Sequence, residues 1–263
     1  MSTVTVTPTV EPSTGAIGDP PRVRLDVVDA DAPAVESVTV TRLDPDGRIV
    51  PVRTFDGNPL DLTGGPGLIY DYEAPFGAPV RYSSQESPAT VSAEVTVDEQ
   101  RVWLIHPGVP ALSMPVNVAE FGKRSRPVAR GVHRPMSRRY PVVQTDGRRK
   151  AAEAVLELNT FTLSERAAFE TLTDDAATLL LNVPAGFGWG VGAEYVDLGD
   201  LDEERLIIWA GQPRRLQTLP YLVVDRPVGG SQAERTLADL AEFASLADLA
   251  LAYESLLDLA AGP

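Results

Sequence analysis

The sequence predicts a mainly β protein: an N-terminal β-sandwich, a second β-rich domain with one packed helix, and a short helical repeat at the C-terminus. Three observations support this prediction. Short segments in the first third alternate apolar and polar residues, one later segment carries a helix-capping signal, and three near-copies of a leucine-rich phrase occupy the last residues. The expected ranges are an extended arm (1–20), a sandwich (21–106), a β-rich domain (107–228) and a repeat segment (229–263).

The first two ranges differ sharply in composition. Residues 1–20 are rich in Thr, Pro and Gly, which favours a flexible or extended arm. From residue 22 onward apolar and polar residues alternate, and turn residues such as the D-P-D-G of 44–47 separate the segments. This pattern is typical of an immunoglobulin-like or fibronectin type III-like sandwich, with Tyr72 and Trp103 as candidate core aromatics. The predicted strands are 22–28, 37–43, 48–55, 67–75, 78–85, 90–97 and 101–107.

The second half is predicted to be β-rich with a helix over 163–173. Thr162 and Glu165 stand at the spacing of a capping box, and Leu163, Ala167 and Leu172 are candidates for its buried face. Alternation favours strand over helix for the end of the segment A-A-E-A-V-L-E-L-N-T. The remaining predicted strands are 116–121, 178–185, 194–199, 205–210 and 213–227.

Charge is distributed unevenly along the chain. The net charge is −14, yet residues 122–150 contain ten Lys and Arg against one acid, Asp146. A basic segment in an acidic chain favours association with another copy or with a complementary neighbour. We therefore predict a homo-oligomeric ring, for which we expect sixfold symmetry. Nucleic-acid binding is disfavoured, because the segment has three prolines and a single aromatic residue for base stacking. The predicted interface residues are Arg138, Arg139, Arg148 and Arg149.

Composition argues against an enzyme. The chain has no cysteine and only two histidines, which excludes thiolate chemistry and leaves little for a histidine-based metal site or catalytic triad. No apolar run reaches the roughly 18 residues of a membrane helix, so we expect no membrane partner. No nucleophile elbow, zinc-protease or P-loop motif occurs. We accordingly predict no catalytic residue, no cofactor and no metal.

Three weaker motifs have plain structural explanations. The glycine-rich G-F-G-W-G-V-G-A of 186–193 loosely matches a dinucleotide fingerprint, but a strand follows it instead of the required helix. The acids of 174–175 and 202–204 stand in predicted turns and are expected to be solvated. Asp26, Asp29 and Asp31 offer oxygen ligands for calcium but lack the spacing of an EF-hand loop.

The C-terminal phrase begins at Thr236, Ser245 and Ser255, each followed three residues later by Asp. Steps of nine and ten residues rotate successive copies on one continuous helix, so short helical pieces fit the repeat better. The Thr or Ser hydroxyl would accept a hydrogen bond from an exposed backbone amide at the helix start. The Asp carboxylate would interact favourably with the positive end of the helix. Short pieces need a surface, which predicts binding to a neighbour; the alternative is one C-terminal helix packed on its own domain. The predicted binding residues are Leu237, Leu240, Leu246, Leu249, Leu256 and Leu259.

Several sequence segments, in the same order along the chain, resemble those of a known family. "YPVVQTDGRRKAAEAVLEL", "LLLNVPAGFGWGVGAEYVDLGDL", "PRRLQTLPYLVVDRP" and the terminal repeat resemble the minor tail proteins of siphophages that infect actinobacteria. Relatives often carry tryptophan where this chain has Leu237, Leu246 and Leu256. The resemblance implies a structural virion protein of the tail tip, made in the host cytoplasm and similar to the distal tail protein. Its implied partners are tail tube, tape-measure and tail-tip proteins.

A carbohydrate-binding module is the alternative function. In that case Phe187 and Trp189, or the loops of the sandwich, would hold a glycan of the host cell wall. Binding of soluble glycan by the isolated chain would distinguish the two functions.

Overall fold

The part of the chain that the structure describes is mainly β, with 48% of it in the strands of antiparallel sheets and a single α-helix beside them. The structure is a computed structural model. It describes residues 4–29, 37–54, 57, 59–63, 65–84, 91–128, 130–134, 136, 139–145, 149–176, 178–206 and 211–227. The six leucines of the C-terminal repeat lie outside these residues.

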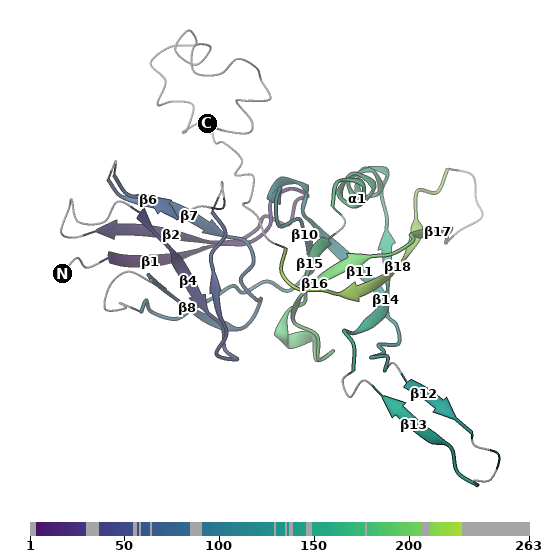
Figure 1. Cartoon of the computed structure of the whole chain (residues 1–263). Helices are drawn as coiled ribbons and strands as arrows, with labels where there is room; N and C mark the ends of the chain where they lie inside the picture. The colour runs from purple at the N-terminus through teal and green to yellow at the C-terminus, as the bar shows by residue number, and fades with distance from the viewer. Residues whose placement is uncertain are drawn as a thin grey trace, which may run out of the picture.

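Two sheets with a common hydrophobic core form the N-terminal half (Figure 1). One has the order β1-β2-β7, with β1 at Val4–Glu11, β2 at Arg22–Asp29 and β7 at Gly67–Asp71. The other has the order β5-β4-β8-β9, with β4 at Val40–Leu43, β5 at Ile49–Pro51, β8 at Pro79–Ser84 and β9 at Val95–Thr96. A short pair joins β3 at Ser37–Val38 to β6 at Leu60–Asp61.

The alternation of the sequence explains this core. Val23, Leu25 and Val27 of β2 are fully buried, while the residues between them lie on the outer face. The predicted arm differs from the structure, because residues 4–11 form strand β1 along the whole of β2. Val4 and Val6 are buried in the core, so their burial overrides the local Thr and Pro content.

A closed six-stranded barrel forms the second half. Each of its strands pairs with two neighbours in the order β14-β11-β10-β15-β16-β18, and β18 returns to β14 over eight residue pairs. Closure leaves no free edge along this circuit. β17 pairs beside the first part of β18. The strands are β10 (Val102–Ile105), β11 (Met114–Phe121), β14 (Glu153–Thr160), β15 (Thr178–Asn182), β16 (Ala193–Leu198), β17 (Asp202–Arg205) and β18 (Arg215–Val223).

Helix α1 (Leu163–Asp175) packs on the barrel core through Phe169 and Leu172. The predicted N-cap is confirmed, because Thr162 Oγ1 accepts a hydrogen bond from the amide of Glu165 at 3.1 Å. The Glu165 carboxylate accepts one from the Phe161 amide at 2.7 Å, one residue before the N-cap amide of a standard capping box. The predicted buried face is only partly right, since Leu163 and Ala167 are exposed. Two 3-10 turns, η1 (Pro110–Leu112) and η2 (Ala185–Phe187), lie in barrel loops.

The two halves meet at β10. Val102 and Leu104 point into the barrel core, whereas Trp103 and Ile105 belong to the core of the N-terminal sheets. Our predicted sandwich included this segment, but its strand partners are β11 and β15 of the barrel. A boundary at residue 106 would therefore separate β10 from both of its partners.

The basic segment contains a hairpin that the sequence did not predict. β12 (Arg130–His133) and β13 (Val142–Thr145) form a separate two-stranded sheet, which projects from the barrel on the side away from the N-terminal sheets (Figure 1).

Candidate functional site

The projecting hairpin continues the ladder between β11 and β14 beyond the end of the barrel. The Gly122 amide donates to the Val155 carbonyl at 2.9 Å, and Ser125 and Glu153 exchange two backbone hydrogen bonds at 2.8 Å. The Lys150 amide then donates to the Pro127 carbonyl at 2.9 Å. These bonds form the stem of the hairpin. They carry the chain from a rigid barrel out to the paired strands β12 and β13.

Neither face of the hairpin is covered by the described chain. Val132 and Val143 pair directly and share one face, and they are 47% and 50% exposed. Val142 lies on the opposite face and is exposed too, as are Met136 and Tyr140 near the tip. A two-stranded hairpin with no hydrophobic backing is marginally stable in water. Its apolar side chains therefore need a partner surface.

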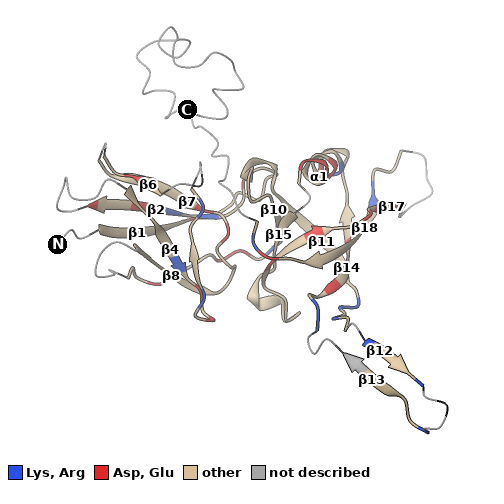
Figure 2. Cartoon of the chain, viewed as in Figure 1, with Lys and Arg blue, Asp and Glu red and all other residues tan. Residues whose placement is uncertain are grey.

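The hairpin and its stem also carry most of the positive charge in the second half (Figure 2). Of the four arginines predicted at an interface, Arg139 lies near the tip, where its guanidinium sits 5.7 Å from the ring centre of Tyr140. Arg149 lies in the stem and donates to the Arg126 carbonyl at 3.4 Å. Both are exposed. Arg138 and Arg148 lie outside the described residues.

The same stem borders a groove on the outer wall of the barrel. The groove has a volume of about 450 Å³ and lies across β14, β16 and β18. Val155, Pro220 and Leu222 form its apolar floor, and Glu153 and Asp197 supply carboxylates. Lys123, Ser125, Ala154, Gly199 and Tyr221 complete its lining.

An aromatic group lies beside the start of the hairpin stem, at Phe121, the last residue of β11. Trp189 lies 5.3 Å from Phe121 and 4.8 Å from Phe187 between ring centres, and Phe121 lies 6.4 Å from Tyr221. Burial raises the pKa of the Tyr221 hydroxyl. Phe187 and Trp189 are each 39% exposed, and their ring planes are inclined at 61°. The pair named for glycan binding is thus partly exposed, but it offers no flat platform.

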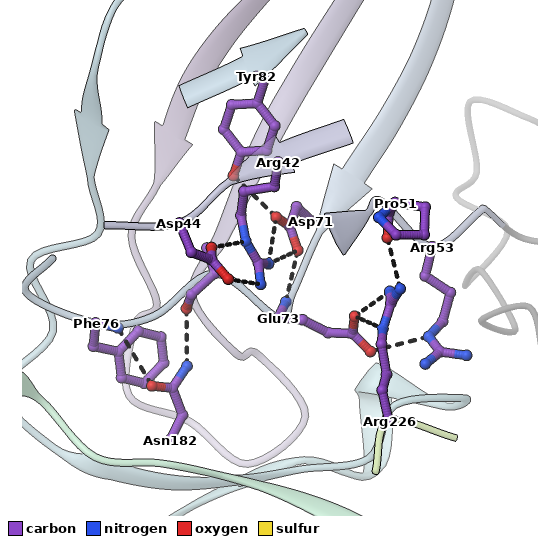
Figure 3. Close-up of polar contacts among 11 residues, drawn as sticks. Arg42, Asp44, Pro51, Arg53, Asp71, Glu73, Phe76, Tyr82, Asn182 and Arg226 are labelled. Atoms are coloured by element: carbon purple, nitrogen blue, oxygen red, sulfur yellow. Dashed lines mark hydrogen bonds and ion pairs between the residues drawn. The ribbon is translucent and has the colours of Figure 1, made fainter. Parts of the chain in front are cut away.

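Two buried polar groups lock the N-terminal sheets and join them to the barrel (Figure 3). In the first, Arg42 Nη1 donates to Asp71 Oδ2 at 2.8 Å and Arg42 Nε donates to Asp44 at 2.6 Å. The Tyr82 hydroxyl donates to Asp71 at 3.0 Å. Burial alone would lower the pKa of Arg42, but the carboxylates of Asp71 and Asp44 raise it above its usual value.

The second group joins the halves directly. Glu73 accepts hydrogen bonds from Arg53 Nε at 3.0 Å and from Arg226 Nε at 2.9 Å, and Arg226 follows the last barrel strand. Asn182 of β15 donates from Nδ2 to the Ala74 carbonyl at 2.9 Å. These contacts hold the N-terminal sheets in one orientation on the barrel. Their residues gave no signal in the sequence, because single polar positions far apart in the chain carry no periodicity.

His106 occupies the turn between β10 and β11. Its Nδ1 accepts hydrogen bonds from the amides of Gly108 at 3.0 Å and Val109 at 2.7 Å, while Nε2 lies 3.1 Å from Asp175 at the end of α1. Burial lowers the pKa of His106, and Asp175 partly opposes that shift. The histidine therefore packs the end of the barrel, as a neutral ring that donates from Nε2.

The weaker sequence motifs form no site in the described residues. Gly188 and Gly190 adopt positive φ angles in a loop, and strand β16 follows them, so no helix is available to bind a pyrophosphate. Asp26 pairs with Arg24 at 2.8 Å, and Asp31 lies outside the described range. Among the described residues no group of three or more His, Asp or Glu is placed to hold a metal ion. No helix that the structure describes is long and apolar enough to cross a membrane.

The sequence matches none of the protein-family models with which it was compared, and no curated protein shows significant similarity to it.

Proposed function

We propose that this protein is a structural component of a siphophage tail tip, which associates head-to-tail into a ring between the tail tube and the adhesion apparatus. The single observation that carries the proposal is the basic hairpin, which extends from a closed barrel with apolar side chains exposed on both faces. Such an element is stable when a neighbour covers it. A projection on one side of a subunit that fits a different surface of the next makes a heterologous contact, which closes into a ring when the rotation allows.

The distribution of charge supports this association. Residues 122–150 have a net charge of +9, while residues 151–227, which contain most of the barrel, have thirteen acids against five bases. A basic projection therefore meets an acidic barrel when two copies approach in head-to-tail order. Complementary charge of this kind speeds encounter and selects the register of the contact. Sixfold symmetry is the form proposed; the distal tail protein, a ring, is the general analogue of the minor tail proteins that the sequence resembles.

The N-terminal sheets are proposed to be a peripheral, fibronectin type III-like sandwich. Three strands on one sheet and four on the other, packed over one core, fit that layout. The sandwich lies on the side of the barrel away from the hairpin (Figure 1), so an assembly contact made by the hairpin leaves it free. The leucine repeat beyond residue 228 is proposed to attach to tail tube, tape-measure or other tail-tip proteins.

Charge reversal tests the proposal. Replacing Arg138, Arg139, Arg148 and Arg149 with Glu should convert a ring into monomers, as measured by native mass spectrometry and by electron microscopy of negatively stained particles. Circular dichroism should show an unchanged monomer fold, because the described arginines are exposed. A control with Arg48→Glu and Arg81→Glu, two exposed arginines of the N-terminal sheets, should still form rings. Normal rings from the fourfold variant would overturn the proposal.

The alternative function, binding of a cell-wall glycan, would use Phe187 and Trp189 or the loops of the sandwich. Sugar rings stack on flat aromatic faces, and the tilted contact of these two rings provides a poor platform. The ring proposal is therefore favoured. Retention of the isolated chain on purified cell wall, with loss on Trp189→Ala, would instead support the alternative.

A further inference from the structure

The outer wall of the barrel has an apolar surface beside the short pairing between β16 and β18. β16 pairs with β18 only between Val196 and Leu198, and the chain then leaves toward β17. The Gly199 amide donates to the Pro220 carbonyl at 2.8 Å, which ends this short ladder. Beyond it, Val155, Pro220 and Leu222 form the floor of the groove of about 450 Å³, and Leu222 is 37% exposed.

One face of the hairpin has the matching chemistry. Val132 and Val143 form a cross-strand pair on that face, and Arg130 shares the face because it lies two residues before Val132. The groove presents an apolar floor with Glu153 and Asp197 beside it. Seating the two valines on the floor would bring the arginine toward the carboxylates. Lys123 also lines the groove, so its two carboxylates leave one net negative charge there. The two surfaces thus complement each other in apolar character and, more weakly, in charge.

The hairpin of the same chain does not fill its own groove. Its stem begins at the groove, where Lys123 and Ser125 contribute to the lining, and β12 and β13 then extend away from the barrel (Figure 1). Among the described residues the two strands pair only with each other. In the part of the chain that the structure describes, no segment of the same chain fills the groove, and a second copy supplies a fitting hairpin.

We infer that the hairpin of one copy docks in the groove between β14, β16 and β18 of the next copy. This inference rests on the proposed function and names the acceptor surface of its ring contact. Donor and acceptor are different surfaces of one chain, so each copy can bind one neighbour through its hairpin and another through its groove.

Cross-linking tests the location, because the natural chain has no cysteine. One preparation carries Val143→Cys and a second carries Leu222→Cys; they are mixed and oxidised. A disulfide requires Cα atoms about 4.4–6.8 Å apart, so a covalent pair on a non-reducing gel reports docking. Val28→Cys, on the exposed outer face of β2, replaces Leu222→Cys in the matched control and should give no such pair.

Native mass spectrometry of the unaltered chain separates the two hypotheses. Rings without a cross-link above the control would overturn the groove as acceptor and leave the proposed function standing. Monomers at every concentration would overturn both.

With both cysteines in one chain, the expected result is a covalent ladder that ends at the closed ring. A ladder that stops at two copies would support the groove but contradict the ring, because it indicates a reciprocal pair.

Charge exchange provides a second readout. Arg130→Glu should raise the concentration needed for assembly by about tenfold, since a charged rim pair becomes repulsive. Adding Asp197→Arg to that variant should bring the concentration needed for assembly most of the way back to that of the unaltered chain. Equal weakening by both single variants with no restoration in the double variant would overturn the pairing of these surfaces.

Discussion

At the scale of single residues, His106 shows how a buried titratable group can couple the fold to pH. Its Nδ1 accepts two backbone hydrogen bonds, from Gly108 and Val109, that only the neutral ring can accept. Protonation of Nδ1 would break both bonds and loosen the turn between β10 and β11. The gain in attraction to Asp175, which lies 3.1 Å from Nε2, is partial compensation.

The pKa of His106 is lowered in the folded state, mainly by burial, so the unfolded chain binds this proton more readily. Stability from the neutral ring is present above the unfolded pKa of about 6.5 and is lost as the pH falls through the window below it. One proton limits the slope to about 1.4 kcal/mol per pH unit. Urea unfolding at pH 7.5 and pH 5.5 should show this loss. His106→Asn, whose Oδ1 can accept the same amides, should reduce it; an unchanged pH dependence would contradict the assignment.

At the scale of elements, the hairpin and the barrel differ in what holds them. The barrel strands close on one another around a buried core, whereas β12 and β13 have only their mutual hydrogen bonds and the stem. The hairpin therefore contributes little to the stability of its own chain. Its exposed valines and arginines were missed as a strand pair because Pro135 and Pro141 interrupt the alternation.

Replacing residues 128–149 with a two-residue Asn-Gly turn should leave the barrel intact, since the ladder between β11 and β14 can close directly below the cut. Differential scanning calorimetry of the monomer should show a melting temperature changed by no more than about 4 °C, which corresponds to roughly 1 kcal/mol. Assembly should be lost. A shortened chain that melts far lower would show that the hairpin belongs to the core of the monomer, and one that still forms rings would contradict its role.

At the scale of the whole molecule, the barrel and the N-terminal sheets depend on one strand. β10 contributes Val102 and Leu104 to one core and Trp103 and Ile105 to the other. Two further contacts tie the halves together: Arg226 donates to Glu73, and Asn182 donates to the Ala74 carbonyl. The halves therefore have separate sheets but a joined interior.

Two truncations test this arrangement. Deleting residues 1–106 removes β10, leaves β11 and β15 without a shared partner, and should give an unfolded or aggregated product. Deleting residues 1–99 keeps β10 in the barrel but exposes Trp103 and Ile105 to solvent. We expect dispersed amide signals in the NMR spectrum of the longer fragment and collapsed signals for the shorter one. A well-folded 107–263 fragment would show that the barrel closes without β10.

Local features could be predicted from the sequence because their causes lie within a few residues. The alternation of β2, the capping box of Thr162 and Glu165, and the concentration of charge in 122–150 each predict an element or a surface without reference to the rest of the chain. The same reasoning placed β10 in the wrong sheet. All four of its residues are buried, so the pattern indicates neighbours on both faces but not which strands they are.

Only the tertiary structure decided the features that join distant residues. Closure of β14 on β18, the burial of Phe169 in place of Leu163, and the two arginines on Glu73 depend on contacts between segments far apart in the chain. Likewise, the groove lies where β16 stops pairing with β18 after three residue pairs. β17 then pairs with the first part of β18. The physical reason is that side-chain periodicity reports how much of a segment is buried, whereas partner choice depends on the packing of the whole chain.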